Sequence, residues 1–378
     1  MCGLLYTNIN FEEKDFLGAL GLMSHRGPDA SDHYFQNQHK FGHNRLKILD
    51  LNDASNQPFF SEDNRYLIIF NGEIFNFKEL AEEYSLNLKT TSDTEVLLKL
   101  FIKFGENMLQ KLNGMFAFVI YDRESDELFV ARDRLGIKPL YIHQSGNKVI
   151  ISSEINAIVY LRKDNTIDDL GKRQYLKLRT FFNNRTIYEG VKFFPAGHYM
   201  KQGKMIKYWD YPETEQEPPS IDELNELVAA AVERWKIADV SVGSFLSGGL
   251  DSTIVTALSN TEHSWTSGFK SMNEFEWGRL ASEHIKTQHH ELEIDKDLFK
   301  DTLDLMIDIR KEPLSVPNEV MLYLMSKQAS EYNTVIMAGE GADELFFGYD
   351  RIFRWASSSE EWNLEEFTKH YAYGAKDD

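Results

Sequence analysis

The chain is poor in cysteine and has no long apolar stretch. Cys2 is the only cysteine among 378 residues, so a disulfide framework is excluded and a reducing compartment is expected. A membrane-spanning helix needs about 20 mostly apolar residues, and the sequence has no such run. The first residues also lack the basic flank and apolar stretch of a signal peptide. These absences predict a cytoplasmic protein with no membrane partner.

Basic residues are also scarce. The sequence has 41 Lys and Arg against 60 Asp and Glu, a formal net charge of −19, and no local basic patch that would attract a nucleic-acid backbone. Nucleic acid is therefore excluded as a partner, and a nucleotide or carboxylate substrate must be held by specific donors and by Mg²⁺. An apolar content of 42% is that of a folded protein, and the length predicts two domains, or three.

Residues 1–210 are predicted to form a layered α+β domain, because strands covered by helices are typical of that class. Short apolar or alternating runs between turn signals predict the strands, and the second predicted helix has Ser92 and Asp93 as cap candidates. The predicted strands are residues 66–70, 117–121, 128–131 and 149–152, and the predicted helices are residues 16–23 and 94–104.

Residues 211–220 have the sequence YPETEQEPPS, which lacks aliphatic side chains and is predicted to be a linker. Beyond it, strand and helix signals alternate through residues 221–378. This alternation predicts a parallel sheet with helices on both faces. The signals are a helix at 221–235, a strand at 240–246, a helix at 252–258, a strand at 265–269 and a helix at 278–285.

Cys2 lies directly behind Met1 and before Gly3, where a structural thiol would have little to pack against. Removal of Met1, which the small side chain of residue 2 should permit, leaves a thiol and a free α-amine on one residue. An α-amine has an unperturbed pKa of about 7.7–8.0, so it can take the thiol proton and return it. This arrangement predicts an N-terminal nucleophile; the alternative is an unreactive cysteine placed there by chance.

A first cluster would serve acyl transfer by Cys2. The segment FNGEIFN, residues 70–76, follows a predicted strand with an Asn-Gly pair that can turn the backbone sharply. The Asn71 side-chain amide and the Gly72 N–H could then point at one oxygen, as an oxyanion hole requires; an ordinary hairpin turn is the alternative. A glutamine substrate also needs a cation for its α-carboxylate and an anion for its α-ammonium, and Arg45 and Asp93 are suitable types. Each is otherwise explained as a surface ion pair or a helix cap.

A second cluster is SGGLDS, residues 247–252, between a predicted strand and a predicted helix. Gly248 and Gly249 let backbone amides approach a phosphate, Ser247 and Ser252 add hydroxyl donors, and Asp251 can hold Mg²⁺ between phosphates. The lysine of a P-loop is missing, so the segment is not the P-loop of phosphoryl-transfer enzymes. A purely structural strand-to-helix turn is the alternative.

A third cluster is AGEGADELFFGY, residues 338–349, which follows the apolar run at 334–337. Carboxylates at the C-terminal end of a parallel strand lie where ligands of open α/β sheets bind. Asp343 is therefore a candidate second Mg²⁺ ligand, and Glu340 a candidate for positioning a substrate or relaying a proton. An acidic helix N-terminus is the alternative.

These motifs resemble those of glutamine-dependent asparagine synthetases, within the class II glutamine amidotransferases. In order along the chain they are MCG, HRGPD, RLKILDL, FNGEIFN, SDTEV, LNGMFAF, ARDRLGIKPLY, SSEI, PAGHY, SGGLDS and GEGADE. The resemblance implies an N-terminal nucleophile αββα sandwich in residues 1–210. It implies an α/β, parallel-sheet ATP-pyrophosphatase-like domain in residues 221–378, short at its C-terminus.

The resemblance also implies roles for individual residues. Cys2 would be the nucleophile, Asn71 and Gly72 the oxyanion hole, and Glu340 a catalytic residue needed to form an acyl-adenylate. Glutamine would be held by Arg45, Leu46, Lys47, Ile48, Leu49, Asn71, Gly72, Glu73 and Asp93. ATP would be held by Leu246, Ser247, Gly248, Gly249, Leu250, Asp251, Ser252, Ser267, Ala338 and Gly339.

Enzymes of this family use ATP and Mg²⁺ to convert a side-chain carboxylate to an acyl-AMP, with release of pyrophosphate. Ammonia made at the cysteine crosses an internal tunnel and displaces AMP; a closed passage keeps the ammonia from being protonated in bulk water. The implied partners are glutamine and a carboxylate acceptor: aspartate, another amino acid, a peptide carboxylate or a sugar acid. The family also implies a homodimer.

The sequence departs from the family pattern in places. Family members usually continue well past the GEGADE block, whereas this chain stops at Asp378; Ala338 stands where serine is common, and Phe347 where glycine is. Three functions stay open: a working ligase, compact or completed by a second chain; a glutaminase with a vestigial nucleotide domain; or a sensor of glutamine or nucleotide without turnover. The intact SGGLDS and GEGADE motifs favour the first.

Overall fold

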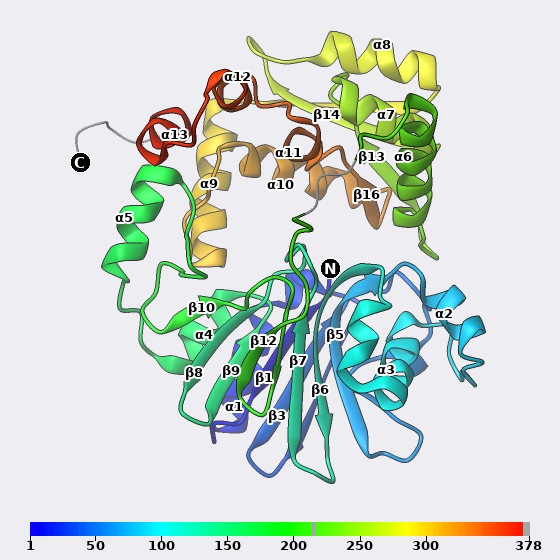
Figure 1. Cartoon of the computed structure of the whole chain (residues 1–378), viewed down its shortest axis with the longest axis vertical. Helices are drawn as coiled ribbons and strands as arrows, with labels where there is room; N and C mark the ends of the chain where they lie inside the picture. Colours follow the sequence, from blue (N-terminus) through cyan, green and yellow to red (C-terminus); the bar gives the residue numbers. More distant parts are fainter. Residues whose placement is uncertain (214–216, 373–378) are drawn as a thin grey trace. The chain divides into compact units, whose positions relative to one another are not determined.

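The computed structural model describes residues 1–213 and 217–372, which its contacts divide into two compact units (Figure 1). Unit 1 contains Met1–Asp168, Asn183–Pro218 and Ile309–Glu312. Unit 2 contains Asp169–Phe182, Pro219–Asp308 and the residues from Pro313 onward. Residues 214–216 of the predicted linker and residues 373–378 lie outside the described residues.

Unit 1 is built around two antiparallel six-stranded sheets (Figure 1). The first has the order β10-β8-β9-β1-β3-β2 and the second the order β12-β11-β7-β6-β5-β4. The strands of the first are β1 Gly3–Thr7, β2 Ala30–Gln36, β3 His39–Arg45, β8 Tyr141–Ser145, β9 Lys148–Ser152 and β10 Val191–Phe193. The strands of the second are β4 Phe59–Phe60, β5 Tyr66–Ile74, β6 Gly114–Asp122, β7 Glu127–Arg132, β11 His198–Lys201 and β12 Lys204–Lys207.

Side-chain alternation explains why the two sheets stack. In β1, Leu4 and Tyr6 join Leu67, Ile69 and the inward residues of β6 in one buried cluster between the sheets. Leu5, which points to the opposite face of β1, packs with the helices α1 (Glu13–Gly21) and α4 (Ile155–Arg162) instead. The helix α3 (Asp93–Phe104), with α2 (Phe77–Glu83) beside it, lies along β5 of the second sheet. The layers are therefore α, β, β and α, as predicted.

The elements predicted for residues 1–210 are present, with different ends. Ser92 is the N-cap of α3, and its hydroxyl accepts from the Thr94 N–H. The prediction of a sharp turn at Asn71-Gly72 was wrong, because β5 runs on to Ile74 and pairs Asn71 with Ala117 and Gly72 with Phe116. A Cβ on Gly72 would lie 2.2 Å from the Met115 carbonyl oxygen, so the glycine permits close approach to β6 rather than a turn.

The segment Ile309–Glu312 belongs to unit 1 although it follows 90 residues of unit 2 that begin at Pro219. The hydroxyl of Tyr141 donates to the Glu312 carboxylate at 3.1 Å, and the Asn156 side-chain amide donates to the Ile309 carbonyl at 3.1 Å. The hydroxyl of Tyr188 donates to the Lys311 carbonyl. Four residues thus hold three side chains of unit 1.

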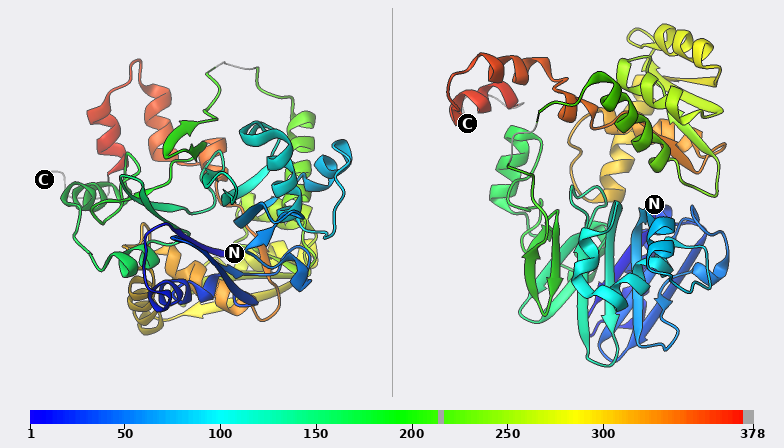
Figure 2. Two further views of the ribbon diagram at one scale, coloured as in Figure 1. Left: turned by 90° about the horizontal axis from the view of Figure 1, so that it is seen from below. Right: turned by 45° about the vertical axis from the view of Figure 1, so that its right-hand side comes forward.

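Unit 2 has a parallel four-stranded sheet in the order β15-β14-β13-β16. Its strands are β13 Val242–Phe245, β14 His263–Phe269, β15 Gln288–Ile294 and β16 Val335–Met337. Figure 2 shows helices on both of its faces, as predicted. The helices of this unit are α5 Asp169–Leu178, α6 Ile221–Trp235, α7 Leu250–Ser259, α8 Phe275–Ile285, α9 Lys296–Arg310, α10 Asn318–Ala329, α11 Ala342–Phe346, α12 Asp350–Ser358 and α13 Leu364–Tyr371, the last two residues of α9 counting with unit 1.

The strand order places a switch point between β13 and β16. From β13 the chain moves outward to β14 and β15 on one side, and it then returns to pair β16 on the other side of β13. Ligands of open α/β sheets bind in the crevice at such a point, beyond the carboxyl ends of the strands. SGGLDS follows β13 and GEGADE follows β16, so the two motifs meet at this crevice.

Phe347 provides a first testable prediction. It follows α11 with φ +60° and ψ +40°, in the left-handed region, which costs a residue with a Cβ about 1–2 kcal/mol. Its ring is 69% exposed. We expect Phe347→Gly to raise the free energy of unfolding by about 1 kcal/mol, measured by denaturant titration.

Phe346 is the matched control, because it is the last residue of α11 and is also exposed. Phe346→Gly should lower the free energy of unfolding by about 1 kcal/mol. Equal effects of the two substitutions would contradict the conformational explanation.

Candidate active site

A pocket in unit 1 surrounds Cys2. The pairing of β1 with β3 sets Gly3 opposite Asn44, so Cys2 lies level with Arg45, and the C-terminal part of β5 reaches the same place. The cavity is small, about 40 Å³. Its lining is Met1, Cys2, Arg45, Leu46, Ile48, Leu49, Gln57, Phe70, Asn71, Gly72, Glu73, Ser92, Asp93, Thr94 and Lys138.

Cys2 is held at the pocket through its backbone. The Arg26 Nε donates to the Cys2 carbonyl at 2.9 Å, and the Arg26 Nη1 donates to the Glu154 carboxylate at 3.1 Å. His25 also hydrogen-bonds Glu154, at 2.9 Å. Burial opposes the charge of Glu154, but the hydrogen bonds from His25 and Arg26 outweigh it and hold the pKa of Glu154 below its usual range. The thiol Sγ lies 3.8 Å from the Leu46 carbonyl oxygen.

The α-amine at the chain start is also enclosed by the pocket. Burial, with smaller contributions from the positive charges of Lys138 and Arg26, lowers the pKa of the Met1 α-amine to about 5. An amine in this environment is therefore neutral at pH 7 and able to accept a proton.

Asn71 carries an unusual cost. Its side chain is 1% exposed, and within the described residues neither its Oδ1 nor its Nδ2 has a hydrogen-bond partner. A buried amide left unsatisfied costs about 1–3 kcal/mol, so such groups are rare unless a ligand completes them. Because Asn71 lines the pocket beside Gly72, its amide is available to an oxygen of a bound substrate.

Arg45 has a second task besides facing the pocket. Its Nη1 donates to the Asn52 carbonyl and to the Asn56 side chain, both at 2.8 Å, and its Nη2 donates to the carbonyls of Leu49 and Asp50. The guanidinium thereby fixes the loop that follows β3. Leu46, Ile48 and Leu49 of this loop line the pocket, whereas Lys47 is absent from the lining and its ammonium pairs with Asp53 at 2.7 Å.

Two carboxyl groups lie in the pocket wall. Burial raises the pKa of Asp93 to about 6, although its Oδ2 accepts from the Ile74 N–H at 2.9 Å. Burial, and the nearby negative charge of Asp93, also raise the pKa of Glu73. The positive charge of Lys138 opposes this rise. A cationic group on a ligand would stabilise the charged form of both carboxylates.

Several lining residues were not predicted to act. Gln57, Phe70, Ser92, Thr94 and Lys138 line the pocket, and Arg26 and Glu154 hold Cys2 from behind. The motifs HRGPD, SSEI and ARDRLGIKPLY contained three of them, but no pattern within these motifs indicated which side chains would turn inward.

A larger cavity, of about 940 Å³, lies at the switch point of unit 2. Its lining includes ten residues predicted to act on nucleotide or acceptor: Leu246, Ser247, Gly249, Asp251, Ser252, Ser267, Ala338, Gly339, Glu340 and Asp343. Gly248 and Leu250 are not in the lining. Gly248 has φ +84°, and a Cβ there would lie 2.4 Å from the Trp277 carbonyl carbon; Leu250 is 76% exposed at the start of α7.

The SGGLDS turn is held by its own hydroxyl groups. The Ser247 Oγ accepts from the Gly249 N–H at 3.2 Å and lies 3.0 Å from the Ser252 Oγ. Gly339 packs against the same turn, since a Cβ on it would lie 3.0 Å from the Asp251 carbonyl carbon and from the Ser252 nitrogen. The loops after β13 and β16 are therefore in direct contact, with Asp251 between them.

The acidic residues of this cavity suit a cation shared with phosphates. Within the described residues, no three His, Cys, Asp or Glu side chains gather as a protein-only metal site. Mg²⁺ is usually held by one or two carboxylates together with substrate phosphates. Asp251 and Asp343 line one cavity with hydroxyl and backbone donors, and this donor set fits Mg²⁺ bound together with a polyphosphate.

The orphaned Asn71 amide gives a stability prediction. Asn71→Leu replaces two unsatisfied polar atoms by an apolar group of similar size, so the free energy of unfolding should rise by about 1 kcal/mol in a denaturant titration. Asn44 is the matched control, since it is equally buried and its Nδ2 donates to the Leu20 carbonyl at 2.8 Å. Asn44→Leu should lower the free energy of unfolding; a fall for both variants would show that Asn71 is satisfied in solution.

Asp93 gives a pH prediction. Its pKa is about 6 in the folded chain against an ordinary 3.8, so the folded state holds an extra proton between these values. Stability from this group therefore falls as pH rises from about 4 to 6 and stays lowered above 6. Asp93→Asn should stabilise the chain at pH 7.5 and much less at pH 4.5, measured as the midpoint of chemical denaturation.

Asp122 is the contrasting case, because Arg65 hydrogen-bonds it at 2.7 Å and lowers its pKa. Its stabilising contribution is present above the ordinary pKa and lost as pH falls. Asp122→Asn should therefore destabilise the chain at pH 7.5. If both substitutions changed the free energy of unfolding in the same direction at pH 7.5, the raised pKa of Asp93 would be contradicted.

Comparison with known proteins finds two family models, one for each half of the chain. A glutamine amidotransferase domain model matches residues 1–209, and an asparagine synthase model matches residues 223–375. The chain is 34% identical to asparagine synthetase [glutamine-hydrolyzing] 1 of Bacillus subtilis, over 88% of this chain and 55% of that protein. It is 30% identical to asparagine synthetase [glutamine-hydrolyzing] 3 of the same organism, over 96% and 66%, and 29% identical to asparagine synthetase B of Escherichia coli, over 92% and 63%.

The chain therefore spans between about half and two thirds of the length of these relatives. No helix among the described residues is long and apolar enough to cross a membrane. The family models and the shared identity across both units show that this chain belongs to the family of glutamine-hydrolysing asparagine synthetases.

Proposed function

We propose that this chain is an ATP-dependent amidotransferase that takes ammonia from glutamine and forms an amide on a carboxylate, with aspartate as the first candidate acceptor. In this proposal the thiolate of Cys2 attacks the side-chain amide of glutamine, ammonia leaves, and water hydrolyses the thioester to glutamate. The acceptor carboxylate takes AMP from ATP with loss of pyrophosphate. Ammonia then displaces AMP from the acyl-adenylate.

The observation that carries the glutaminase half is the unpaired amide of Asn71. Asn71 lines the pocket of Cys2, and its Nδ2 has no protein acceptor among the described residues. A hydrogen-bond donor fixed beside a nucleophile and aimed at a developing oxyanion is worth about 3–4 kcal/mol in the transition state. A buried but unsatisfied donor is the expected ground-state cost of such a site.

Removal of Met1 is part of the proposal. The Met1 residue itself lines the pocket, whose volume is only about 40 Å³. Its removal would vacate space for glutamine and would place the α-amine on Cys2. Burial and the charges of Lys138 and Arg26 lower the pKa of the present α-amine, and the same surroundings would keep the new amine neutral. A neutral amine can act as the general base for the thiol.

The roles proposed for the glutamine contacts follow from charge. Glu73 and Asp93 would receive the α-ammonium, and Arg45 would receive the α-carboxylate with whichever donors its loop contacts leave. These three residues line the same pocket as Cys2, so a single glutamine can reach them. Leu46, Ile48 and Leu49 would line its aliphatic part.

The synthetase half rests on the cavity at the switch point. Ser247, Gly249, Ser252 and the first turn of α7 would bind the phosphates of ATP, because hydroxyls and helix N-terminal amides are natural phosphate donors. Asp251 and Asp343 would hold Mg²⁺, which when bound offsets the charge of the phosphates. Glu340 would position the acceptor at the same cavity. We propose the domain boundary in the linker at residues 211–220, with residues 221–378 as the synthetase region.

The proposal is tested by following two products of one purified chain. Pyrophosphate release should need ATP, Mg²⁺ and a carboxylate acceptor, and it should fall by at least about 100-fold in Asp251→Ala because the phosphate-bound cation loses a ligand. Cys2→Ala should abolish glutamate production and leave synthesis from ammonium chloride intact. Mass spectrometry should show chains that begin at Cys2.

Each outcome has a distinct meaning. Unchanged pyrophosphate release in Asp251→Ala would remove the nucleotide assignment, and full glutaminase activity with Met1 retained would remove the N-terminal nucleophile. Glutamate production without an ATP-dependent product would instead identify a glutaminase. A panel of amino-acid, peptide and sugar-acid carboxylates in the pyrophosphate assay would identify the acceptor.

A further inference from the structure

Lys138 is a buried lysine in the wall of the Cys2 pocket. It is 5% exposed, while its neighbour Ile137 is 43% exposed, so the chain turns the charged side chain inward and the apolar one outward. Among the described residues, its ammonium has no ion-pair partner within 4.0 Å. Burying an ammonium group without a partner destabilises the folded state. This destabilisation indicates that Lys138 has a functional role.

The backbone around Lys138 is fixed by two buried side chains. The Asp133 carboxylate accepts from the N–H groups of Ile137 at 2.9 Å and Lys138 at 3.0 Å. The Arg132 guanidinium donates to the carbonyls of Lys138 at 2.8 Å, Gly136 at 2.7 Å and Phe194 at 2.6 Å. The position of Lys138 at the pocket is therefore set by the fold and does not depend on a ligand.

The charges that face Lys138 come from several elements. Glu73 of β5 and the thiol of Cys2 favour the charged form of Lys138, and so does Asp133, which lies in the same loop as Lys138. Arg26, in the segment after α1, disfavours the charged form. Burial is the largest influence and lowers the pKa of Lys138. Asp93 of α3 and the α-amine at the chain start act on Glu73 from the other sides, the first raising and the second lowering the pKa of Glu73.

We propose that Lys138 is a positioning residue for the amide donor: its buried ammonium, in the same pocket lining as Glu73 and Asp93, favours the charged carboxylate of Glu73, so that Glu73 can receive the α-ammonium of glutamine. This inference rests on the proposed function of the pocket. Two carboxylates buried side by side repel each other, and one of them takes up a proton unless a cation is close. Lys138 supplies that cation without occupying the space that the substrate needs.

The sign of the effect follows from charge. Loss of the Lys138 charge raises the pKa of Glu73 further, so that less of it is ionised at neutral pH and glutamine binds more weakly. Loss of the Lys138 charge also raises the pKa of the α-amine, because a nearby positive charge disfavours the protonated form of an amine. The amine then becomes less available as a base. An amide donor that lacks the α-ammonium separates the two effects, since Glu73 has nothing to bind on it whereas the base serves both donors.

The experiment compares glutamine with 4-carbamoylbutanoate, its analogue without the α-amino group, as amide donors for the full chain. In Lys138→Met, kcat/KM for glutamine at pH 7 should fall about tenfold relative to the analogue, which corresponds to one unit of pKa. The loss should appear in KM and should become smaller as the pH rises above 7, because more of the Glu73 carboxyl is then ionised. Lys138→Arg should retain the preference.

Lys40→Met is the matched control, because Lys40 is 7% exposed in β3 and its ammonium lies 4.8 Å from the Phe35 ring centroid, outside the pocket lining. It should leave the discrimination unchanged. In a Glu73→Gln background, Lys138→Met should cause no further loss. Calorimetry of the two donors binding to the Cys2→Ala chain supplies the same comparison without turnover. Binding of the analogue also shows that the variant chain is folded.

Two results would overturn the proposal. Equal losses of kcat/KM for glutamine and the analogue would show that Lys138 acts through the α-amine or through the stability of the fold, and not through Glu73. Unchanged discrimination in Lys138→Met would show that Glu73 is charged without it. A wild-type chain that binds glutamine without hydrolysing it would contradict the glutaminase proposal but not the role of Lys138, so the two failures are distinguishable.

Discussion

The antiparallel pairing of β5 with β6 is the constraint on which the pocket around Cys2 depends. Gly72 lets the two strands approach so closely that no Cβ fits against the Met115 carbonyl. The pairing fixes the direction of Asn71, whose amide then faces the pocket without a protein partner. It also fixes Glu73, two residues from Asn71 along the same strand. The two side chains proposed to bind an oxyanion and an ammonium thus come from one strand.

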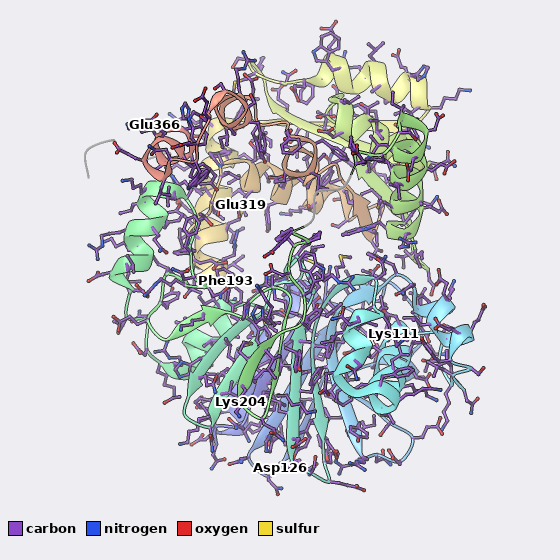
Figure 3. The ribbon with its side chains drawn as sticks, viewed as in Figure 1. Lys111, Asp126, Phe193, Lys204, Glu319 and Glu366 are labelled. Carbon is purple, nitrogen blue, oxygen red and sulfur yellow. The ribbon has the colours of Figure 1, made fainter. Side chains whose placement is uncertain are left out.

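The segments that line the pocket are held in place by hydrogen bonds from charged side chains. Arg45 ties the loop after β3, Arg26 ties the Cys2 carbonyl to Glu154, and Asp133 orders the loop that carries Lys138. Each interaction uses a charged group against backbone carbonyl or N–H groups, which is about twice as strong as a neutral hydrogen bond. Figure 3 shows Asp126 at the opposite end of β6 from this region, where Asp126 accepts from Tyr121 at 2.5 Å. The Tyr121 hydroxyl therefore has a protein partner, in contrast to the amide of Asn71.

Much of the fold was predictable because local patterns and tertiary contacts agree. The apolar core of β5 and β6 and the strand-to-helix turn at SGGLDS were visible in single segments. The strands β1, β2 and β3 were not predicted: β2 and β3 contain Asp32, His33, His43 and Asn44, which look like loop residues. Asp32 and His33 are tolerated because they face solvent, whereas the buried His43 and Asn44 hydrogen-bond to the carbonyls of Phe70 and Leu20. The turn at Asn71-Gly72 was mispredicted because local turn propensity was overridden by pairing with β6.

The inward orientation of Lys138 could not be predicted from a local pattern. Arg132, which holds the Lys138 carbonyl, also donates to the carbonyl of Phe194, 62 residues further along the chain.

The four residues Ile309–Glu312 have a consequence for how the molecule can be divided. They accept hydrogen bonds from Asn156, Tyr188 and Tyr141, all of which precede the boundary between the two matched family regions. A polypeptide ending near residue 210 would expose a tyrosine hydroxyl that is now fully enclosed and would lose the acidic partner beneath it. The region that matches the amidotransferase model is therefore incomplete by itself, because its hydrogen bonding is completed by Ile309–Glu312, which lie far beyond its end in the sequence.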